Sequence, residues 1–204
     1  MKMHILKTAY RFLVLGLLAS GLAACGGNKV SRVDENEVID VTDKWNSSDS
    51  QMVAKQMLED MVTFPWLSKW DNNHDRPPRV IIKSVINKSH EHIPTDTFIN
   101  DLKRAMLKSG KLEFVSGGAA REEVRQERMG QDVYASEESR AQMGAETGAD
   151  FALAGSINST VQQADGTRVT YYQVDLKLVD MTSTQEVWYG QKKIKKLSEK
   201  GGFF

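Results

Sequence analysis

Two alternating segments joined by an Asp-Gly turn constrain the fold of this chain more than any other feature. The segments FALAGSINSTVQQ and RVTYYQVDLKLVD flank residues 164–167, which read Ala-Asp-Gly-Thr. Asp-Gly accepts the positive φ that tight turns require, so the segments are predicted to form an antiparallel hairpin. In the second segment, polar residues alternate with apolar ones at Tyr172, Val174, Leu176 and Leu178. One face of the sheet is therefore expected to be buried and the other to contact water.

The rest of the pattern adds strands and helices to this hairpin. EVWYGQKKI is predicted to return as a further strand, and RVIIKSVIN, which is rich in β-branched residues, to form a buried strand. A helix is predicted from Asp49 to Pro65, with Asp49 or Ser50 as its cap and apolar residues at Ala54, Met57, Leu58 and Met61. Further helices are expected after Thr95-Asp96 and in the charged stretches AAREEVRQERMGQ and SEESRAQMGAETGAD. The predicted fold is α+β, a single, largely antiparallel sheet of about four strands with helices packed on it.

The first 25 residues have the features of an export signal. The basic residues Lys2, Lys7 and Arg11 precede the apolar run FLVLGLLASGLAA, which is too short for a stable membrane span. The run ends in Leu-Ala-Ala-Cys, which resembles the lipobox of bacterial lipoproteins. We therefore expect residues 1–24 to be a signal peptide and Cys25 to be the lipid-attachment residue. Because Gly26 follows in place of an aspartate, the periplasmic face of the outer membrane is the expected location.

The mature chain is expected to be one domain on a short tether. We assign residues 25–37 to the tether, 38–198 to the domain and 199–204 to a C-terminal tail. The polar stretch 26–49 spans about 80 Å at most when fully extended, and about 27 Å on average as a flexible coil. If EVIDVTDKW docks on the domain, only about ten residues stay free. Cys25 is the only cysteine, so no intrachain disulfide can form.

Charge excludes one class of partner. Without the three leader cations, the 27 basic residues fall to 24, against 27 acidic residues. No basic field remains that would recruit nucleic acid.

The segment Ser89-His90-Glu91-His92-Ile93-Pro94 is the main candidate site. It follows the predicted strand RVIIKSVIN and precedes a helix, so it is expected to be a loop. A zinc site usually needs three or four ligands, and two neighbouring histidines supply only two, with His74 as a distant third. We therefore interpret His90, Glu91 and His92 as partner-binding residues of a recognition loop, and expect no metal.

Catalysis is not expected. The sequence contains no Gly-X-Ser-X-Gly elbow, no phosphate-binding loop and no His-Glu-X-X-His motif. Ser109-Gly110-Lys111 is better explained as the end of a helix. We expect neither enzymatic activity nor a cofactor.

Three long segments resemble the LpoB family of penicillin-binding protein activators. They are SVINKSHEHIPTDTFINDLKRAMLKSGKLEFV, GADFALAGSI and YYQVDLKLVDMTSTQEVW, and VTDKWNSSDSQMVAKQMLEDM is similar upstream. The resemblance implies a fold like the N-terminal domain of TolB, and binding and stimulation of a bifunctional class A penicillin-binding protein. The best-known member of the family has a long, proline-rich tether. Here the four prolines lie at 65, 77, 78 and 94, outside the tether.

Two other functions fit parts of the sequence. One is a structural accessory of an envelope or secretion assembly, resembling CsgG-type lipoproteins, although only one hairpin region is present and the sheet itself needs it. The other is glycan binding, for which the stacking platforms would be Trp66, Trp70, Tyr171 and Tyr172. Alternation predicts that one tyrosine of the adjacent pair is buried, which disfavours glycan binding.

Overall fold

The computed structural model describes residues 30–34, 37–138 and 146–199. Residues 1–37 and 38–204 form separate units, and every helix and strand described below belongs to the second unit. The expected signal peptide 1–24 and lipid-attachment residue Cys25 lie outside the described residues. So do most of the expected tether 25–37 and of the tail 199–204. No helix in the described part of the chain is long and apolar enough to cross a membrane.

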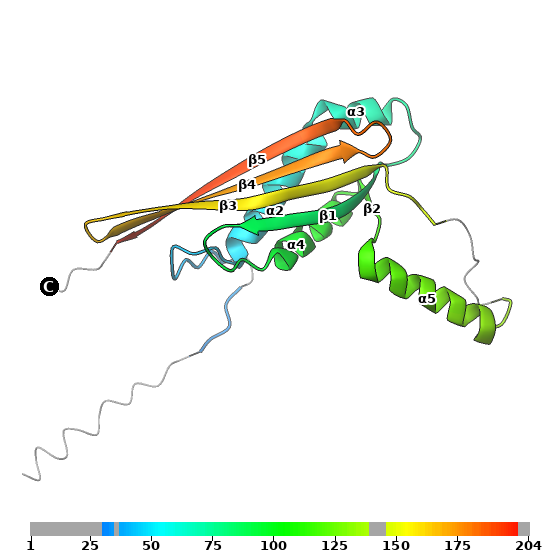
Figure 1. Cartoon of the computed structure of the whole chain (residues 1–204), viewed down its shortest axis with the longest axis horizontal. Coiled ribbons are helices and arrows are strands. Elements are labelled where there is room, and N and C mark those ends of the chain that lie inside the picture. The colour runs from blue at the N-terminus through cyan, green and yellow to red at the C-terminus, as the bar shows by residue number, and fades with distance from the viewer. Residues whose placement is uncertain (1–29, 35–36, 139–145, 200–204) are drawn as a thin grey trace, which may run out of the picture. The chain divides into compact units, whose positions relative to one another are not determined.

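One five-stranded sheet organises the second unit, in the order β2-β1-β3-β4-β5 (Figure 1). Its strands are β1 Arg79–Lys88, β2 Glu113–Phe114, β3 Phe151–Ala164, β4 Thr167–Asp180 and β5 Glu186–Glu199. β1 pairs in parallel with β2 and β3, whereas β3, β4 and β5 form an antiparallel meander. The predicted α+β class is confirmed, and the sheet has five strands where about four were expected.

The predicted hairpin is present between β3 and β4. Asp165 and Gly166 occupy its turn with φ values of 47° and 80°, the positive range that the Asp-Gly pair was expected to adopt. Along β4 every second residue from Thr170 to Leu178 is buried. The predicted alternation is confirmed, with Tyr172 as the buried member of the tyrosine pair.

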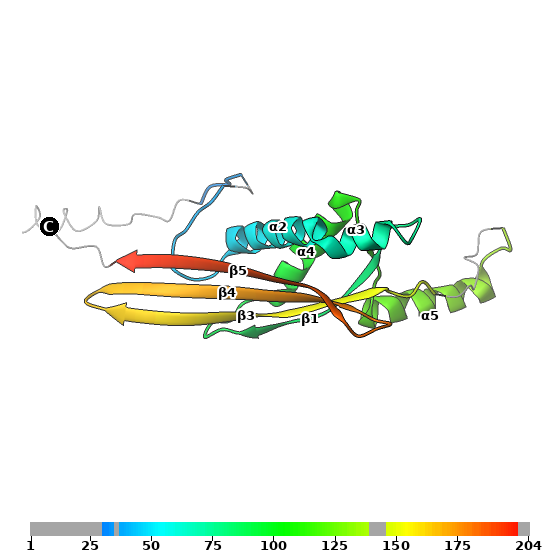
Figure 2. The same ribbon diagram turned by 90° about the horizontal axis from the view of Figure 1, so that it is seen from above.

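Helices cover one face of the sheet: α2 Ser47–Thr63, α3 Pro65–Asp71 and α4 Thr95–Ser109 (Figure 2). The N-cap of α2 is Asn46, not Asp49 or Ser50 as predicted. The Asn46 side chain accepts the Asp49 N–H, and the Asp49 carboxylate accepts the Asn46 N–H. These reciprocal bonds form a capping box, so Asp49 still supports the helix start from its third position.

The core lies between these helices and the sheet. Its largest fully buried side chains include Trp188 of β5, Tyr172 of β4 and Phe98 of α4. The indole N–H of Trp188 donates to the Asp60 carboxylate of α2 at 2.8 Å, so β5 and α2 are joined by a hydrogen bond as well as by packing. Gly190 leaves room for the Trp188 ring, because a Cβ there would stand 2.1 Å from it.

Helix α5, Gly118–Tyr134, buries none of its residues. It corresponds to the first of the two charged stretches that were predicted to be helical. Of the second stretch, residues 139–145 lie outside the described part, and its described residues form a turn or irregular backbone.

Candidate functional site

The loop from Ser89 to Pro94 follows β1 and precedes α4, as predicted, and hydrogen bonds fix its backbone. The Asn87 side-chain amide donates to the Glu91 carbonyl at 2.7 Å. The backbone N–H and the hydroxyl of Ser89 both donate to the Asn87 side-chain oxygen, at 2.9 and 2.6 Å. Such side-chain bonds to nearby backbone replace ladder bonds where a strand ends. Because Ile93 is also buried in the core, the loop is anchored at both ends.

Glu91 points into the domain. One of its carboxylate oxygens accepts the Tyr172 hydroxyl at 2.7 Å, and the other accepts the backbone N–H of Trp45 at 3.3 Å. Burial raises the pKa of Tyr172, and the bond to the Glu91 carboxylate raises that pKa further. The phenol therefore stays protonated and donates to Glu91. This carboxylate links the loop to the middle of the sheet and to the chain before α2.

His90 and His92 flank this anchor and are exposed. The backbone N–H of His90 donates to the Ser159 hydroxyl of β3 at 3.0 Å, and the same hydroxyl lies 3.2 Å from the ring Nδ1. Of the three residues predicted to contact a partner, the two histidines are accessible and Glu91 holds the loop in place.

His74 is not brought to this loop. It precedes the ten-residue strand β1 whereas His90 follows it, so about 30 Å of strand separates them. The His74 ring stacks on Trp70 at a centroid distance of 3.6 Å. Within residues 30–34, 37–138 and 146–199, no group of three or more histidine, cysteine or acidic side chains could hold a metal ion.

The segment 40–46, here called the strap, lies against the sheet beside the loop. The Lys196 ammonium donates to the Asp40 carboxylate at 2.8 Å and forms an ion pair with Asp49 at 2.6 Å. Burial lowers the pKa of Lys196, but the bonds to Asp40 and Asp49 outweigh it, so the net pKa is raised. The Asp43 carboxylate accepts the Thr170 hydroxyl of β4. The chain from the tether therefore joins the domain at a fixed place.

The strap also contributes an aromatic contact. Trp45 packs edge-on against Phe98 of α4 and Tyr172 of β4, with centroid distances of 6.4 and 5.6 Å. The expected docking of the segment 37–45 therefore occurs from Asp40 onward, whereas Val38 remains exposed. Strap, loop and β4 meet at Tyr172.

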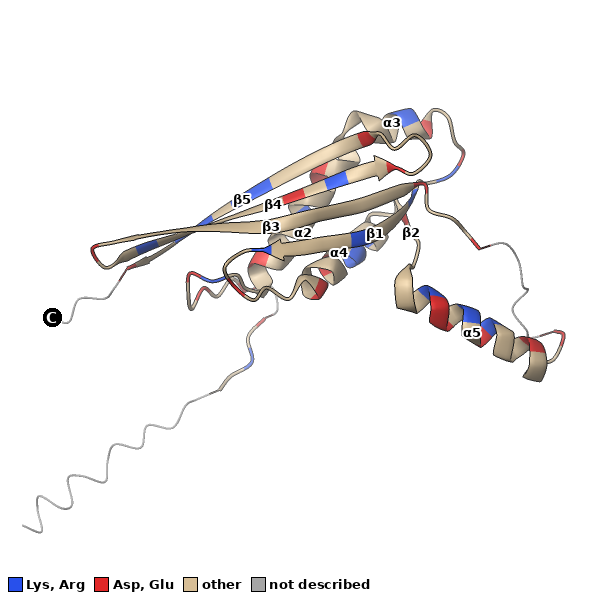
Figure 3. Cartoon of the chain, viewed as in Figure 1, with Lys and Arg blue, Asp and Glu red and all other residues tan. Residues whose placement is uncertain are grey.

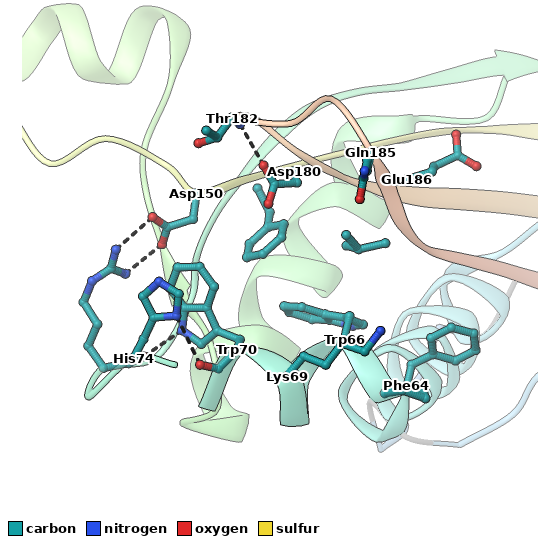
Figure 4. A pocket seen from close by; sticks show the side chains of 14 residues that line it. Phe64, Trp66, Lys69, Trp70, His74, Asp150, Asp180, Thr182, Gln185 and Glu186 are labelled. Atoms are coloured by element: carbon teal, nitrogen blue, oxygen red, sulfur yellow. Dashed lines mark hydrogen bonds and ion pairs between the residues drawn. The ribbon is translucent and has the colours of Figure 1, made fainter. Parts of the chain in front are cut away.

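A cavity of about 600 Å³ lies at the other end of β1 (Figure 4). Two of its charged lining residues are paired with each other, since Arg76 donates to both Asp150 oxygens at 2.7 and 2.8 Å. Burial would raise the pKa of Asp150, but the bonds from Arg76 and from the Arg79 N–H hold it below its usual value. His74 covers one face of Trp70, and the Arg76 guanidinium lies 5.1 Å from its ring centroid.

The cavity offers little to a glycan. Trp66 is 6 % exposed and Tyr172 is fully buried, so neither ring can act as an open stacking platform. Tyr171 is half-buried on the helix-free face of the sheet. The four aromatic residues considered from the sequence therefore do not form one surface.

Two side-chain contacts, one at each end of β1, were not predicted from the sequence. Glu91 bonds a residue 81 positions away, and Arg76 bonds one 74 positions away. No local spacing connects residues so distant. The parallel pairing of β1 with β3 brings Arg76 to Asp150, and the further pairing of β3 with β4 brings Glu91 to Tyr172.

Comparisons with known proteins give the family. The family model "Peptidoglycan-synthase activator LpoB" matches residues 49–194. A search of curated proteins found no match.

Solved structures with similar folds include the LpoB C-terminal domain from Salmonella enterica, which is 14% identical with a TM-score of 0.41. That match covers 72% of this chain and 99% of the other. The NMR structure of E. coli LpoB is 12% identical with a TM-score of 0.40, covering 88% of this chain and 87% of the other. Lipoprotein GNA1162 from Neisseria meningitidis is 19% identical with a TM-score of 0.40. That match covers 60% of this chain and 85% of the other.

The family predicted from the sequence is thus confirmed by a match that runs from α2 to β5. The chain belongs to the LpoB family of peptidoglycan-synthase activators.

Proposed function

We propose that this chain is an outer-membrane lipoprotein, anchored through Cys25, that binds and activates a bifunctional class A penicillin-binding protein. The observation that carries the proposal is the family match over residues 49–194, which includes the anchored loop and most of the sheet. The lipoprotein performs no chemistry itself. It shifts the synthase toward an active conformation to the extent that it binds this conformation better.

We assign the partner contact to His90 and His92, with Glu91 in support. Two exposed imidazoles lie on a backbone already fixed by Asn87, Ser89 and Ser159. A preformed loop loses little conformational entropy when a partner binds, so its contacts translate efficiently into affinity. The bonds from Glu91 to Tyr172 and Trp45 maintain that preformed state.

The length of the tether limits how far from the outer membrane the domain can bind its partner. The first contact of the strap with the sheet is made by Asp40, so fifteen residues, 25–39, precede it. Fully extended, they span about 50 Å. The synthase must therefore extend to within this reach, plus the length of the domain, of the outer membrane.

Affinity capture from solubilised membranes tests the proposal. The bait is the mature chain from Gly26, without lipid, and we expect it to retain a class A penicillin-binding protein. The variant His90→Ala/His92→Ala should lose this capture. His74→Ala is the matched control, because it removes an exposed imidazole at the opposite end of β1 and should capture normally.

Other results would point to the functions considered above. Recovery of outer-membrane assembly subunits without a synthase would indicate a structural accessory. Retention on purified sacculi alone would indicate glycan binding. Equal capture by the double variant and the wild type would show that the loop is not part of the interface. The proposed activator role would not be affected by that result.

A further inference from the structure

Strand β5 has an uneven distribution of charge along its length. Its first six residues, Glu186–Gln191, include no lysine, whereas four of the next five, residues 192–196, are lysines. Blue bands mark lysines on β5 in Figure 3. β5 is an edge strand of the sheet, and its side chains on the helix-free face, from Tyr189 to Leu197, are exposed.

Only one of these lysines is used within the fold. Lys196 is bound to Asp40 and Asp49 on the helix-bearing face. In the part of the chain that the structure describes, Lys192, Lys193 and Lys195 form no ion pair. Lys193 and Lys195 are exposed and lie on the helix-free face, opposite Gln173 and Tyr171 of β4. Leu197, 62 % exposed, continues this face.

The strap joins the domain at the same place. Asp40 is held by Lys196, one residue beyond Lys195, and Lys193 lies within about 10 Å of Lys196 along the strand. Fifteen residues at most separate Asp40 from the proposed acyl chain at Cys25. The lysine-rich half of β5 is therefore next to the place where the chain from the tether joins the sheet.

We propose that the segment Lys192–Leu197 of β5 contacts the anionic lipid surface of the membrane to which the chain is anchored. This inference rests on the lipid anchor of the proposed function. Lysine ammonium groups are attracted by lipid phosphates, so a basic patch adds an electrostatic attraction to the hydrophobic attachment of the lipid anchor. Leu197 provides an apolar side chain beside them.

A role in preventing aggregation does not account for the distribution. Lysines on an exposed edge strand discourage pairing with other chains, but this need applies along the whole edge. In this strand, the half near Trp188 contains no lysine. The acidic side chains of the strap, Asp40 and Asp43, are already bonded to Lys196 and Thr170 and do not neutralise the free lysines.

Contact through β5 orients the domain. Strands β4 and β3 separate β5 from β1, so the loop with His90 and His92 lies three strand spacings away, about 14 Å. With β5 against the bilayer, the width of these strands separates this loop from the lipid contact. The partner contact and the lipid contact are then on different strands of one sheet.

Vesicle co-sedimentation tests the lipid contact directly. The mature chain from Gly26 to Phe204, without its lipid, is mixed with phosphatidylcholine vesicles that contain or lack phosphatidylglycerol. We expect binding only to the anionic vesicles, and its loss at high salt. Lys193→Gln/Lys195→Gln should lower the partition coefficient at least about tenfold, since each surface lysine contributes about fivefold. Lys108→Gln/Lys111→Gln, the matched control at the far end of α4, should change it less than about twofold.

The opposite results would overturn the inference. Equal loss in both double variants, or equal binding to both kinds of vesicle, would mean that β5 makes no specific lipid contact. Binding to polyglutamate without binding to anionic vesicles would indicate an acidic protein partner instead. Since the probe has no acyl chain, these outcomes are independent of synthase activation, and mass spectrometry of Cys25 tests the anchor separately.

Discussion

Replacing Tyr172 with phenylalanine removes one hydroxyl from the junction of loop, strap and sheet. The ring keeps its packing, so no cavity term arises. The hydroxyl loses its 2.7 Å bond to the Glu91 carboxylate and a longer contact, 3.2 Å, with the Asp43 carbonyl. Hydrogen bonds to charged groups contribute about 1.5–3 kcal/mol. We therefore expect the free energy of unfolding to fall by about 2 kcal/mol. For a domain of this size, that corresponds to a fall in Tm of about 4–8 °C.

Urea unfolding monitored by circular dichroism measures this loss. Glu91→Ala removes the other partner, and the double variant should show a coupling free energy of at least about 1 kcal/mol. Tyr189→Phe is the matched control, because its exposed hydroxyl donates to Asp175 at 2.9 Å in solvent. It should cost less than about 0.5 kcal/mol. Equal losses for Tyr172→Phe and Tyr189→Phe, or strictly additive losses in the double variant, would refute the role assigned to this junction.

The remaining predictions concern packing and charge. Gly190→Ala places a Cβ against the Trp188 ring and should cost about 2 kcal/mol in a urea melt, whereas Gly130→Ala, in open space on α5, should be neutral or stabilising. Lys196→Met removes the cation paired with buried Asp49 and should cost about 3 kcal/mol, with proteolysis of the strap as a second readout. In the wild type, the raised pKa of Lys196 gives stability that is complete below its ordinary value of 10.5 and is lost as pH rises through the higher folded value. The lowered pKa of Asp150 gives stability that is complete above 3.8 and is lost as pH falls through the lower folded value, so acid melts of Asp150→Asn should lack this loss.

The sheet could be predicted from the sequence because its signals are local. Alternation over ten residues identifies β4, and Asp165-Gly166 identifies the turn before it. The pairing of β1 with β2 could not be predicted, because β2 has only two residues and its neighbour is 34 positions away. Similarly, Asn46 was missed as a cap because four polar residues that favour N-caps, 47–50, follow it.

The candidate site was only partly predictable. That His90 and His92 lie on an exposed loop follows from the strand before them and the helix after them. That Glu91 points inward does not, since its partners are Tyr172 on a distant strand and the backbone of Trp45. From the sequence, a carboxylate between two histidines is expected to share their exposed surface. In the fold, Glu91 instead points inward and holds the loop in place.

The synthesis of glycan chains by a purified class A penicillin-binding protein, with and without the mature chain, tests the central claim most directly. We expect that adding the chain raises the initial rate of polymerisation and that His90→Ala/His92→Ala abolishes this rise without lowering Tm. An unchanged rate for every class A enzyme of the same cell, with wild-type chain in saturating excess, would contradict it.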